Sequence, residues 1–439
     1  MSMSTKSEPK YNSVMVALCD INGAFRGKRL PIDQVDKVFD GSLRMPMSAA
    51  TVDVWGRDIE GSELVFESGD ADGICLPIRD EILPSPWMGA SSGFVPVCMY
   101  DENGAPHPTD SRHALAAVVA RFAALGLRPV VATELEFYLT DLHEQGGIPS
   151  SEKFDTENVL SVQELERLSP FLDDVYAACA ESGIPVDAAI SETGAGQFEI
   201  NLLHTDDPLR AADDAMMFKR IVKGFAKSHG HTATFMAKPY GDGAGSGLHV
   251  HFSLLNEKDE NVFDDGSDEG SDIMRAAIGG LTDAMQESAL LFAPHFNSYR
   301  RLRPNSHAPT TVAWGYENRT AAIRIPGGNN KARRIEHRVA GADANPYLVL
   351  AAILGAALAG IEGKTRAPEP LTGNVYEAGM PQLPLDWAAA IDAFEQGPIV
   401  ADIFDPSLLQ LIVQSKRQEL ERFLETVTKL EYQTYLEVV

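Results

Sequence analysis

A strand with two histidines on one face is predicted at Gly245-Ser246-Gly247-Leu248-His249-Val250-His251-Phe252-Ser253. Alternate residues of a β-strand point to the same side of a sheet, so His249 and His251 share a face. The glycines that precede them suit a close approach between backbone and ligand. A lone His-x-His pair is a weak signal, and its weight here comes from similar pairs elsewhere in the chain.

Further segments of the chain place charged side chains at alternate positions, as strands that carry charge on one face would. These positions are Glu134 and Glu136, and Arg334, Glu336 and Arg338, while Glu192 and Glu199 lie on either side of a Gly-Ala-Gly-Gln step. Glu192 and Glu199 are seven residues apart, which would put them on opposite faces of one regular strand. We therefore expect a one-residue bulge at the glycines between them. A sheet face with this much charge is tolerable only where it binds ions or charged ligands.

Composition narrows the classes of partner. The chain has 439 residues, is 44% hydrophobic and has a formal net charge of -26, which describes a globular and acidic protein. This charge argues against nucleic acid and against anionic membrane surfaces, since both attract Lys and Arg. The cysteines lack metal-binding or redox spacing and no signal peptide is evident, so we expect a reduced, cytoplasmic protein. The apolar run from Pro346 to Ile361 is predicted to be a buried helix, too short to span a bilayer.

Two domains are predicted. Residues 12–105 are read as a small β-rich domain, with a hairpin turn at Asn22-Gly23. Residues 106–439 alternate strands with longer helices, which begin at Asp110-Ser111, Asp207-Pro208 and Asn345-Pro346. Within the first domain, Asp53 lies beside Trp55 in a segment that spacing alone describes as a surface loop. The organisation as a whole is α+β.

A basic stretch at 297–338 stands out in so acidic a chain. Guanidinium groups match carboxylate and phosphate oxygens, although any one of these arginines could simply pair with a nearby acid. Carboxylates with a His suit hard divalent cations such as Mg²⁺ or Mn²⁺. Arginines and divalent cations together are used to transfer a phosphoryl group from a nucleotide such as ATP. No P-loop motif is present.

Seven ordered motifs occur along the chain: 134–137 (Glu-Leu-Glu-Phe), 196–199 (Gly-Gln-Phe-Glu), 245–251, 297–302 (Asn-Ser-Tyr-Arg-Arg-Leu), 318–319 (Asn-Arg), 324–326 (Arg-Ile-Pro) and 334–338 (Arg-Ile-Glu-His-Arg). Together they resemble the glutamine synthetase superfamily over almost the whole chain. The resemblance implies a β-grasp N-terminal domain and a catalytic domain whose antiparallel sheet forms a metal-lined funnel. It also implies a homododecamer in which neighbouring subunits share active sites.

The resemblance also implies a role for each matching residue. The first metal would be held by Glu136, Glu192 and Glu199, and the second by Glu134, His249 and Glu336. Nucleotide contacts are expected from His251, Ser253, Arg319, Arg324, Lys331 and Arg334. Glutamate and the transferred phosphoryl group would contact Gly245, Arg301, Arg338 and Glu134. The residues expected to act in catalysis are Asp53, His307, Arg319 and Arg338.

Departures from the ammonia-using members bear on the second substrate. His307 stands where those members carry an acidic residue that binds ammonium, and Ala244 stands where they carry an Asn. Their Asp-Gly-Ser-Ser segment is replaced by residues 52–56, in which Asp53 retains an acid. This pattern resembles the branch that joins glutamate to organic amines, including glutamate–putrescine ligases. Two alternatives stay open, a glutamine synthetase that uses ammonium and an inactive structural member of the superfamily.

Overall fold

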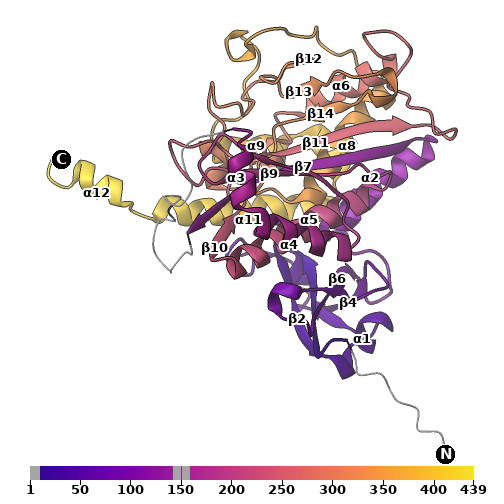
Figure 1. Cartoon of the computed structure of the whole chain (residues 1–439), viewed down its shortest axis with the longest axis vertical. Helices are drawn as coiled ribbons and strands as arrows, with labels where there is room; N and C mark the ends of the chain where they lie inside the picture. Colours follow the sequence, from indigo (N-terminus) through magenta and orange to yellow (C-terminus); the bar gives the residue numbers. More distant parts are fainter. Residues whose placement is uncertain (1–9, 142–149, 151–158) are drawn as a thin grey trace, which may run out of the picture.

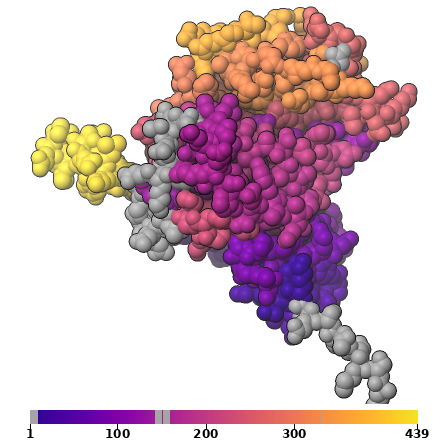
Figure 2. Space-filling view, in the orientation of Figure 1, coloured from indigo at the N-terminus to yellow at the C-terminus, as the bar shows by residue number. Residues whose placement is uncertain are grey.

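The computed structural model describes residues 10–141, 150 and 159–439. An N-terminal sheet lies at the bottom of Figure 1, and a larger sheet with helices packed against it lies above. The C-terminal helix projects sideways from the body of the protein in Figures 1 and 2. The predicted α+β class is confirmed.

The N-terminal sheet has the strand order β2-β1-β6-β4-β3, with β5 added beside β6. Its strands are β1 (Ser13–Cys19), β2 (Phe25–Pro31), β3 (Arg44–Pro46), β4 (Asp72–Pro77), β5 (Leu83–Pro84) and β6 (Ser92–Tyr100), and α1 (Asp36–Phe39) follows β2. A parallel β1–β6 pair lies at the centre, as in a β-grasp sheet. The predicted hairpin at Asn22-Gly23 joins β1 to β2, with Gly23 at φ +71°.

Alternation along β1 explains how this sheet meets the rest of the protein. Val14, Val16 and Leu18 point into a small core within the N-terminal sheet. Ala17 and Cys19 point to the other side and join the large core of the catalytic part. Both faces of the strand are therefore buried, and the N-terminal sheet is packed directly onto the catalytic part. The domain boundary at 105/106 stays a prediction.

The larger sheet has the strand order β12-β13-β14-β11-β7-β9-β8, with β10 beside the end of β7. Its strands are β7 (Arg128–Asp141), β8 (Val186–Ser191), β9 (Gln197–Leu202), β10 (His231–Thr234), β11 (Leu248–Leu255), β12 (Trp314–Tyr316), β13 (Ile323–Ile325) and β14 (Ile335–His337). The pairs are antiparallel as expected, except that β12 runs parallel to β13. The predicted histidine strand, β11, lies at its centre.

Helices cover this sheet, and several begin where the sequence predicts a cap. They are α2 (Ser111–Ala124), α3 (Val162–Arg167), α4 (Ser169–Glu181), α5 (Pro208–Ser228), α6 (Asp272–Ala284), α7 (Ala289–Phe292), α8 (Pro346–Gly363), α9 (Trp387–Gln396), α10 (Pro398–Ile403), α11 (Pro406–Glu425) and α12 (Lys429–Tyr435). The side chains of Asp110, Asp207 and Asn345 accept hydrogen bonds from backbone N–H groups in the first turns of α2, α5 and α8.

Helix α8 is the predicted buried helix. In the described part of the chain it is the one helix long and apolar enough to cross a membrane by length and composition, so the length argument made from sequence does not distinguish it. Burial does, because 78% of this 18-residue helix is enclosed within the protein. It packs against α2, α5 and α6 as a core helix.

Candidate active site

Strand register brings the predicted acidic residues and histidines onto one face of the larger sheet. Across β14 and β11, Glu336 lies opposite His251. Across β11 and β7, His249 lies opposite Glu134. Directly opposed residues on neighbouring strands point to the same side. The same holds for Glu136 on β7 and Glu199 on β9, so a stripe of acids and histidines crosses four strands.

Glu192 reaches this face by a different route from the one predicted. The sequence was interpreted as one strand with a bulge at the glycines, and that interpretation is wrong. The chain reverses between β8 and β9, which pair as an antiparallel hairpin with Ile190 opposite Glu199. Glu192 follows Ile190 by two residues, and its N–H donates to the carbonyl of Gln197 (2.9 Å). A hairpin places Glu192 and Glu199 on the same side without a bulge.

Ligand atoms come within 4.8 Å of one another in two groups. One group contains Glu134, Glu199 and His249, and the other contains Glu134, His251 and Glu336. The predicted grouping differed, because it placed His251 on phosphate and Glu199 with Glu136 and Glu192. Glu134 belongs to both groups, since its two carboxylate oxygens lie 3.3 Å from Nδ1 of His249 and 2.9 Å from Nε2 of His251.

Glu136 is held by the glycine segment that precedes β11. Its Oε2 accepts hydrogen bonds from the N–H of Gly247 (2.7 Å) and from Nε2 of Gln197 (3.3 Å). The same Gln197 amide also donates to the carbonyl oxygen of Gly245 (3.0 Å). Gln197 thus connects the acidic stripe to the segment expected to contact glutamate, a positioning role that was not predicted.

The carboxylates of the stripe have different pKa values, because each lies among a different set of charged neighbours. Burial and the neighbouring carboxylates raise the pKa of Glu199 to about 9, and burial with the nearby Glu136 raises that of Glu192 to about 7. Burial opposes ionisation of Glu336 as well, but Arg338 and the histidines lower its pKa to about 2. Hydrogen bonds from His249 and His251 likewise outweigh burial and lower the pKa of Glu134.

This donor set fits hard divalent cations. Carboxylate oxygens dominate it, an imidazole nitrogen is acceptable to Mn²⁺, and no thiolate is among the clustered residues that the structure describes. A cation between Glu134, Glu192 and Glu199 would remove the mutual repulsion that raises two of their pKa values. The residues that would hold such ions are the predicted set together with His251.

Arginines lie along one side of the stripe. Arg324 donates to Glu336 (2.7 Å) and to the exposed Glu317 (3.0 Å), and Arg338 also pairs with Glu336. The Nε of Arg338 is buried and has no hydrogen-bond partner among the described residues, so one donor stays available. Nε of Arg334 donates to Nδ1 of His251 (3.2 Å). Arg319 is exposed and close enough to Glu192 to influence its pKa.

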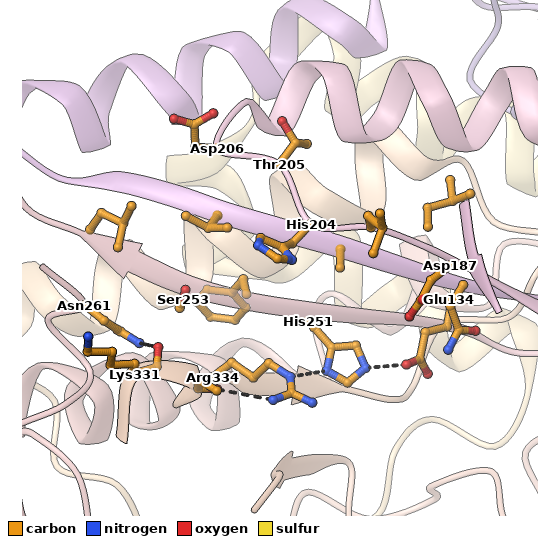
Figure 3. A pocket seen from close by; sticks show the side chains of 18 residues that line it. Glu134, Asp187, His204, Thr205, Asp206, His251, Ser253, Asn261, Lys331 and Arg334 are labelled. Carbon is orange, nitrogen blue, oxygen red and sulfur yellow. Dashed lines mark hydrogen bonds and ion pairs between the residues drawn. The ribbon is translucent and has the colours of Figure 1, made fainter. Parts of the chain in front are cut away.

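A cavity of about 680 Å³ opens beside the stripe. Figure 3 shows His251 between Glu134 and Arg334, with Ser253 and Lys331 further along the same wall. All five were predicted as substrate, nucleotide or metal contacts. Six polar lining residues were missed, namely Asp187, Asn201, His204, Thr205, Asp206 and Asn261. Asn201 could have been found, because it continues the alternation of Gln197 and Glu199 and lies opposite Glu134.

The glycines before β11 allow a close approach to Arg301. A Cβ added at Gly245 would lie 2.6 Å from Cγ of Arg301, and one at Gly247 would lie 2.9 Å from its Nη2. Arg301 is buried, and its guanidinium donates to the carbonyl oxygens of Val339 (2.7 Å) and Arg338 (3.4 Å). Backbone carbonyls orient this cation and do not neutralise it, as expected of a group that binds a carboxylate.

Comparison with known proteins agrees with this geometry. Residues 108–435 match the model of the glutamine synthetase catalytic domain. The chain belongs to the glutamine synthetase family. Among its relatives, it is 38% identical to the Escherichia coli gamma-glutamylputrescine synthetase PuuA, covering 98% of this chain and 92% of that protein. It is 30% identical to a Pseudomonas glutamate–isopropylamine ligase, covering 98% and 96% of the two chains. The family resemblance read from the motifs is therefore confirmed.

Solved structures agree with the fold of this family member. The structure described as apo GmaS without ligand superimposes with a TM-score of 0.85 at 28% identity, covering 97% of each chain. The structure described as a GmaS/ADP complex gives a TM-score of 0.84 at 27% identity with the same coverage. Ligases of this family use ATP and divalent metal ions, which fits the acidic stripe and the cavity described above.

Two residues predicted to act on the amine do not line the cavity beside the stripe. Asp53 is buried, and its carboxylate accepts from the N–H groups of Trp55 and Arg57 (2.9 Å each) and from Nε2 of Gln418 (3.0 Å). His307 is exposed on a loop, with φ +59°. In this family member, a catalytic role for either residue stays a prediction.

Proposed function

We propose that the protein is an ATP-dependent ligase that joins the side-chain carboxylate of glutamate to an organic amine, with putrescine or another small alkyl amine favoured. The observation that carries this proposal is the stripe of acids and histidines on one sheet face, flanked by arginines and open to a cavity. Similarity to ligases named for putrescine and for isopropylamine supports an organic amine as acceptor.

The cavity is the proposed nucleotide site. Its volume of about 680 Å³ is within the usual range for small-molecule sites, about 300–1,000 Å³. Ser253, Lys331 and Arg334 offer a hydroxyl, an ammonium and a guanidinium along one wall. These donors suit phosphate oxygens. Glu134 and His251 at the inner end would then lie where the terminal phosphate meets the metal-binding stripe.

The proposed reaction has two steps. The side-chain carboxylate of glutamate attacks the terminal phosphorus of ATP, which gives γ-glutamyl phosphate and releases ADP. The amine then attacks the acyl carbon, phosphate leaves, and the amine gives its extra proton to a base, for which Asp53 and His307 are the candidates. Bound divalent cations would supply electrostatic stabilisation of the phosphoryl oxygens. Arg338, Arg324 and Arg319 add fixed positive charge beside them.

Position 307 is the basis for preferring an organic amine. Ammonium offers a protein little besides charge and N–H donors, so a site for it needs a nearby carboxylate, and His307 provides none. An alkyl amine can instead bury methylene groups, each worth about 0.8 kcal/mol. A tenfold advantage in kcat/KM requires only about 1.4 kcal/mol of additional transition-state binding.

We also propose a cytoplasmic homo-oligomer, a dodecamer as in the family, with shared sites. The loop of Asp53 is fixed by α11 of its own chain, and Asp53 does not line the cavity beside that chain's stripe. A catalytic role for Asp53 would therefore require the site of a neighbouring subunit. Helix α12 and the residues after it also expose apolar side chains, including Leu430 (69%) and Leu436 (71%), as an unformed interface would.

Phosphate release measured with glutamate, ATP and a panel of amines tests the proposed function. We expect an organic amine to exceed ammonium in kcat/KM by at least about tenfold. His307→Glu should raise ammonium turnover, while Asn305→Asp on the same loop should not. Equal use of ammonium and of every organic amine would favour the second candidate, a glutamine synthetase. Absence of any glutamate-dependent turnover with Mg²⁺ or Mn²⁺ would favour an inactive structural protein.

A further inference from the structure

A second cavity, of about 990 Å³, lies between the N-terminal sheet and helix α5. One wall comes from the hairpin that joins β1 to β2 and from the segment at Trp87 and Met88. The opposite wall comes from α5 and from the segment after it. None of the residues assigned above to the nucleotide, the metals or glutamate lines this cavity. It is therefore separate from the candidate active site.

Four cations of α5 line the cavity, Lys219, Arg220, Lys223 and Lys227. Among the described lining residues, the one carboxylate is Asp343. Asp343 is close enough to Lys219 to influence its pKa, but no carboxylate in the described part of the chain forms an ion pair with any of the four cations. This is a concentration of basic side chains with few acidic neighbours, in a chain whose net charge is -26. Solvated lysines on a helix face are common, so the inference depends on how these cations are held.

The groups that contact Lys219 and Arg220 most closely are uncharged. Lys219 is only 7% exposed, and its Nζ donates to the backbone carbonyl of Ala344 (3.0 Å). The Arg220 guanidinium lies 4.7 Å from the ring centroid of Trp87 and 4.1 Å from that of Phe94. Its Nη1 is buried and has no hydrogen-bond partner among the described residues. Aromatic rings and a carbonyl orient these charges without cancelling them.

Burial makes the charged forms of these side chains less favourable. Burial, with repulsion from Lys223 as the next cause, lowers the pKa of Lys219 to about 7. Burial also lowers the pKa of Arg220 to about 10. A buried cation without a counter-charge is unfavourable, and an anion placed beside it offsets the cost of desolvation.

We propose that this cavity binds a small oxyanion with at least two negative charges, either a phosphate-bearing molecule or a dicarboxylate. The cations on one wall provide the recognition, and Trp87 and the hairpin close the opposite side. Because the two walls belong to the N-terminal sheet and to α5, the bound anion stabilises the contact between them. An anion that binds the folded protein and not the unfolded chain also raises the thermal stability of the protein.

Titration of the full-length protein with inorganic phosphate, and separately with succinate, tests the proposal through tryptophan fluorescence and thermal unfolding. The ring of Trp87 lies against Arg220, so we expect a saturable fluorescence change that Trp87→Phe removes. The double variant Lys223→Gln/Lys227→Gln should weaken binding at least about tenfold, equivalent to about 1.4 kcal/mol. Both lysines are exposed in the cavity, so the variant should fold. Lys258→Gln, an exposed lysine outside the cavity, is the matched control.

Comparison of the two anions shows which chemistry is preferred. Arg334→Gln, at the other cavity, should leave the fluorescence response intact. A response abolished by Arg334→Gln, or unchanged in the lysine double variant, would place the anion in the candidate active site and overturn the proposal. Absence of a saturable response to either anion would also overturn it. So would a change of oligomeric state in the double variant without anion binding, since the cations would then be a subunit contact.

Discussion

At the scale of single residues, Glu336 connects the acidic stripe to the arginines. It is 1% exposed, accepts from Arg324 and Arg338, and lies opposite His251 on the neighbouring strand. Its carboxylate is ionised because those arginines and the histidines lower its pKa to about 2 against the effect of burial. An ionised carboxylate at this point can bind a cation and can also orient Arg338.

Glu336→Gln should remove this charge while keeping the shape and an acceptor oxygen. We expect ATP-dependent ligation to fall by roughly 100-fold or more, as for other changes at metal sites, and Mn²⁺ affinity measured by calorimetry to fall with it. Glu317→Gln is the matched control, since Glu317 also pairs with Arg324 but is 57% exposed. Full activity of Glu336→Gln at millimolar Mg²⁺ would contradict the metal assignment.

Glu199 leads to a prediction about pH. Its pKa is about 9 in the fold against 4.5 in a model peptide, so the folded protein holds this proton more tightly than the unfolded chain. The stabilisation is fully present below the lower value and is lost as the pH rises through the higher one. We therefore expect the free energy of unfolding of metal-free protein to decrease with rising pH, by up to about 1.4 kcal/mol per unit.

Urea unfolding in EDTA between about pH 6 and pH 9 measures this dependence. Glu199→Gln should flatten it, because the amide has no proton to lose. Glu102→Gln, at an exposed acid of the N-terminal sheet region, should leave the slope unchanged. An identical slope in the wild-type protein and in Glu199→Gln would show that the crowded carboxylates do not control stability. Added Mg²⁺ should stabilise most at high pH.

At the scale of secondary-structure elements, the β8–β9 hairpin delivers Glu192 and Glu199 to the stripe together. Its turn is packed tightly, since a Cβ at Gly194 would lie 2.0 Å from the Tyr138 hydroxyl and 2.9 Å from Oε1 of Gln197. Gln197 in turn contacts Glu136 and Gly245. A displaced turn would therefore shift the metal ligands and the segment next to glutamate at once.

Gly194→Ala tests this coupling. We expect kcat to fall at least about tenfold, because a misplacement of about 1 Å can cost far more than that in rate. Gly241→Ala is the control, since a Cβ there meets nothing within 4 Å. Kinetics with glutamate and the preferred amine, together with far-UV circular dichroism, separate a shifted site from an unfolded chain. Wild-type kinetics in Gly194→Ala would show that the turn tolerates displacement.

At the scale of the whole molecule, α12 extends from the body (Figures 1 and 2) and carries apolar side chains with little to cover them. Val438 and Val439 are 79% and 94% exposed. By contrast, Phe423 at the end of α11 stacks on Phe296 with ring centroids 5.0 Å apart. The chain therefore leaves the core after α11, and residues 427–439 are available to another subunit.

Deletion of residues 427–439 should produce a smaller particle in multi-angle light scattering without unfolding the chain. The physical reason is that the deleted segment carries exposed apolar side chains, which another subunit can cover. The segment contributes nothing to the enclosed core. Replacement of Leu430 and Leu436 by Ser is a milder version that keeps the length. An oligomer of unchanged size after both changes would place the subunit contacts elsewhere, and a fully active monomer would refute shared sites.

Local rules in the sequence were sufficient for the helix caps and for the strand faces. Asp110, Asp207 and Asn345 cap helices because a cap depends only on the next few residues. His249 and His251 share a face because strand alternation has a period of two. The motifs identified the family, and they predicted most of the residues that the structure brings together at the candidate site. Asn201 was missed although the same alternation reaches it.

Tertiary structure alone decided which of these residues meet. The pairing of Glu336 with His251, and of Glu136 with Glu199, depends on the register of strands far apart in the chain. The reversal that brings Glu192 beside Glu199 depends on the pairing of β8 with β9, which spacing along one strand does not reveal. The cations of α5 became informative only once the N-terminal sheet enclosed them. The register of the strands and the enclosure of these side chains depend on how distant segments pack together. Patterns within one segment of the sequence therefore do not predict them.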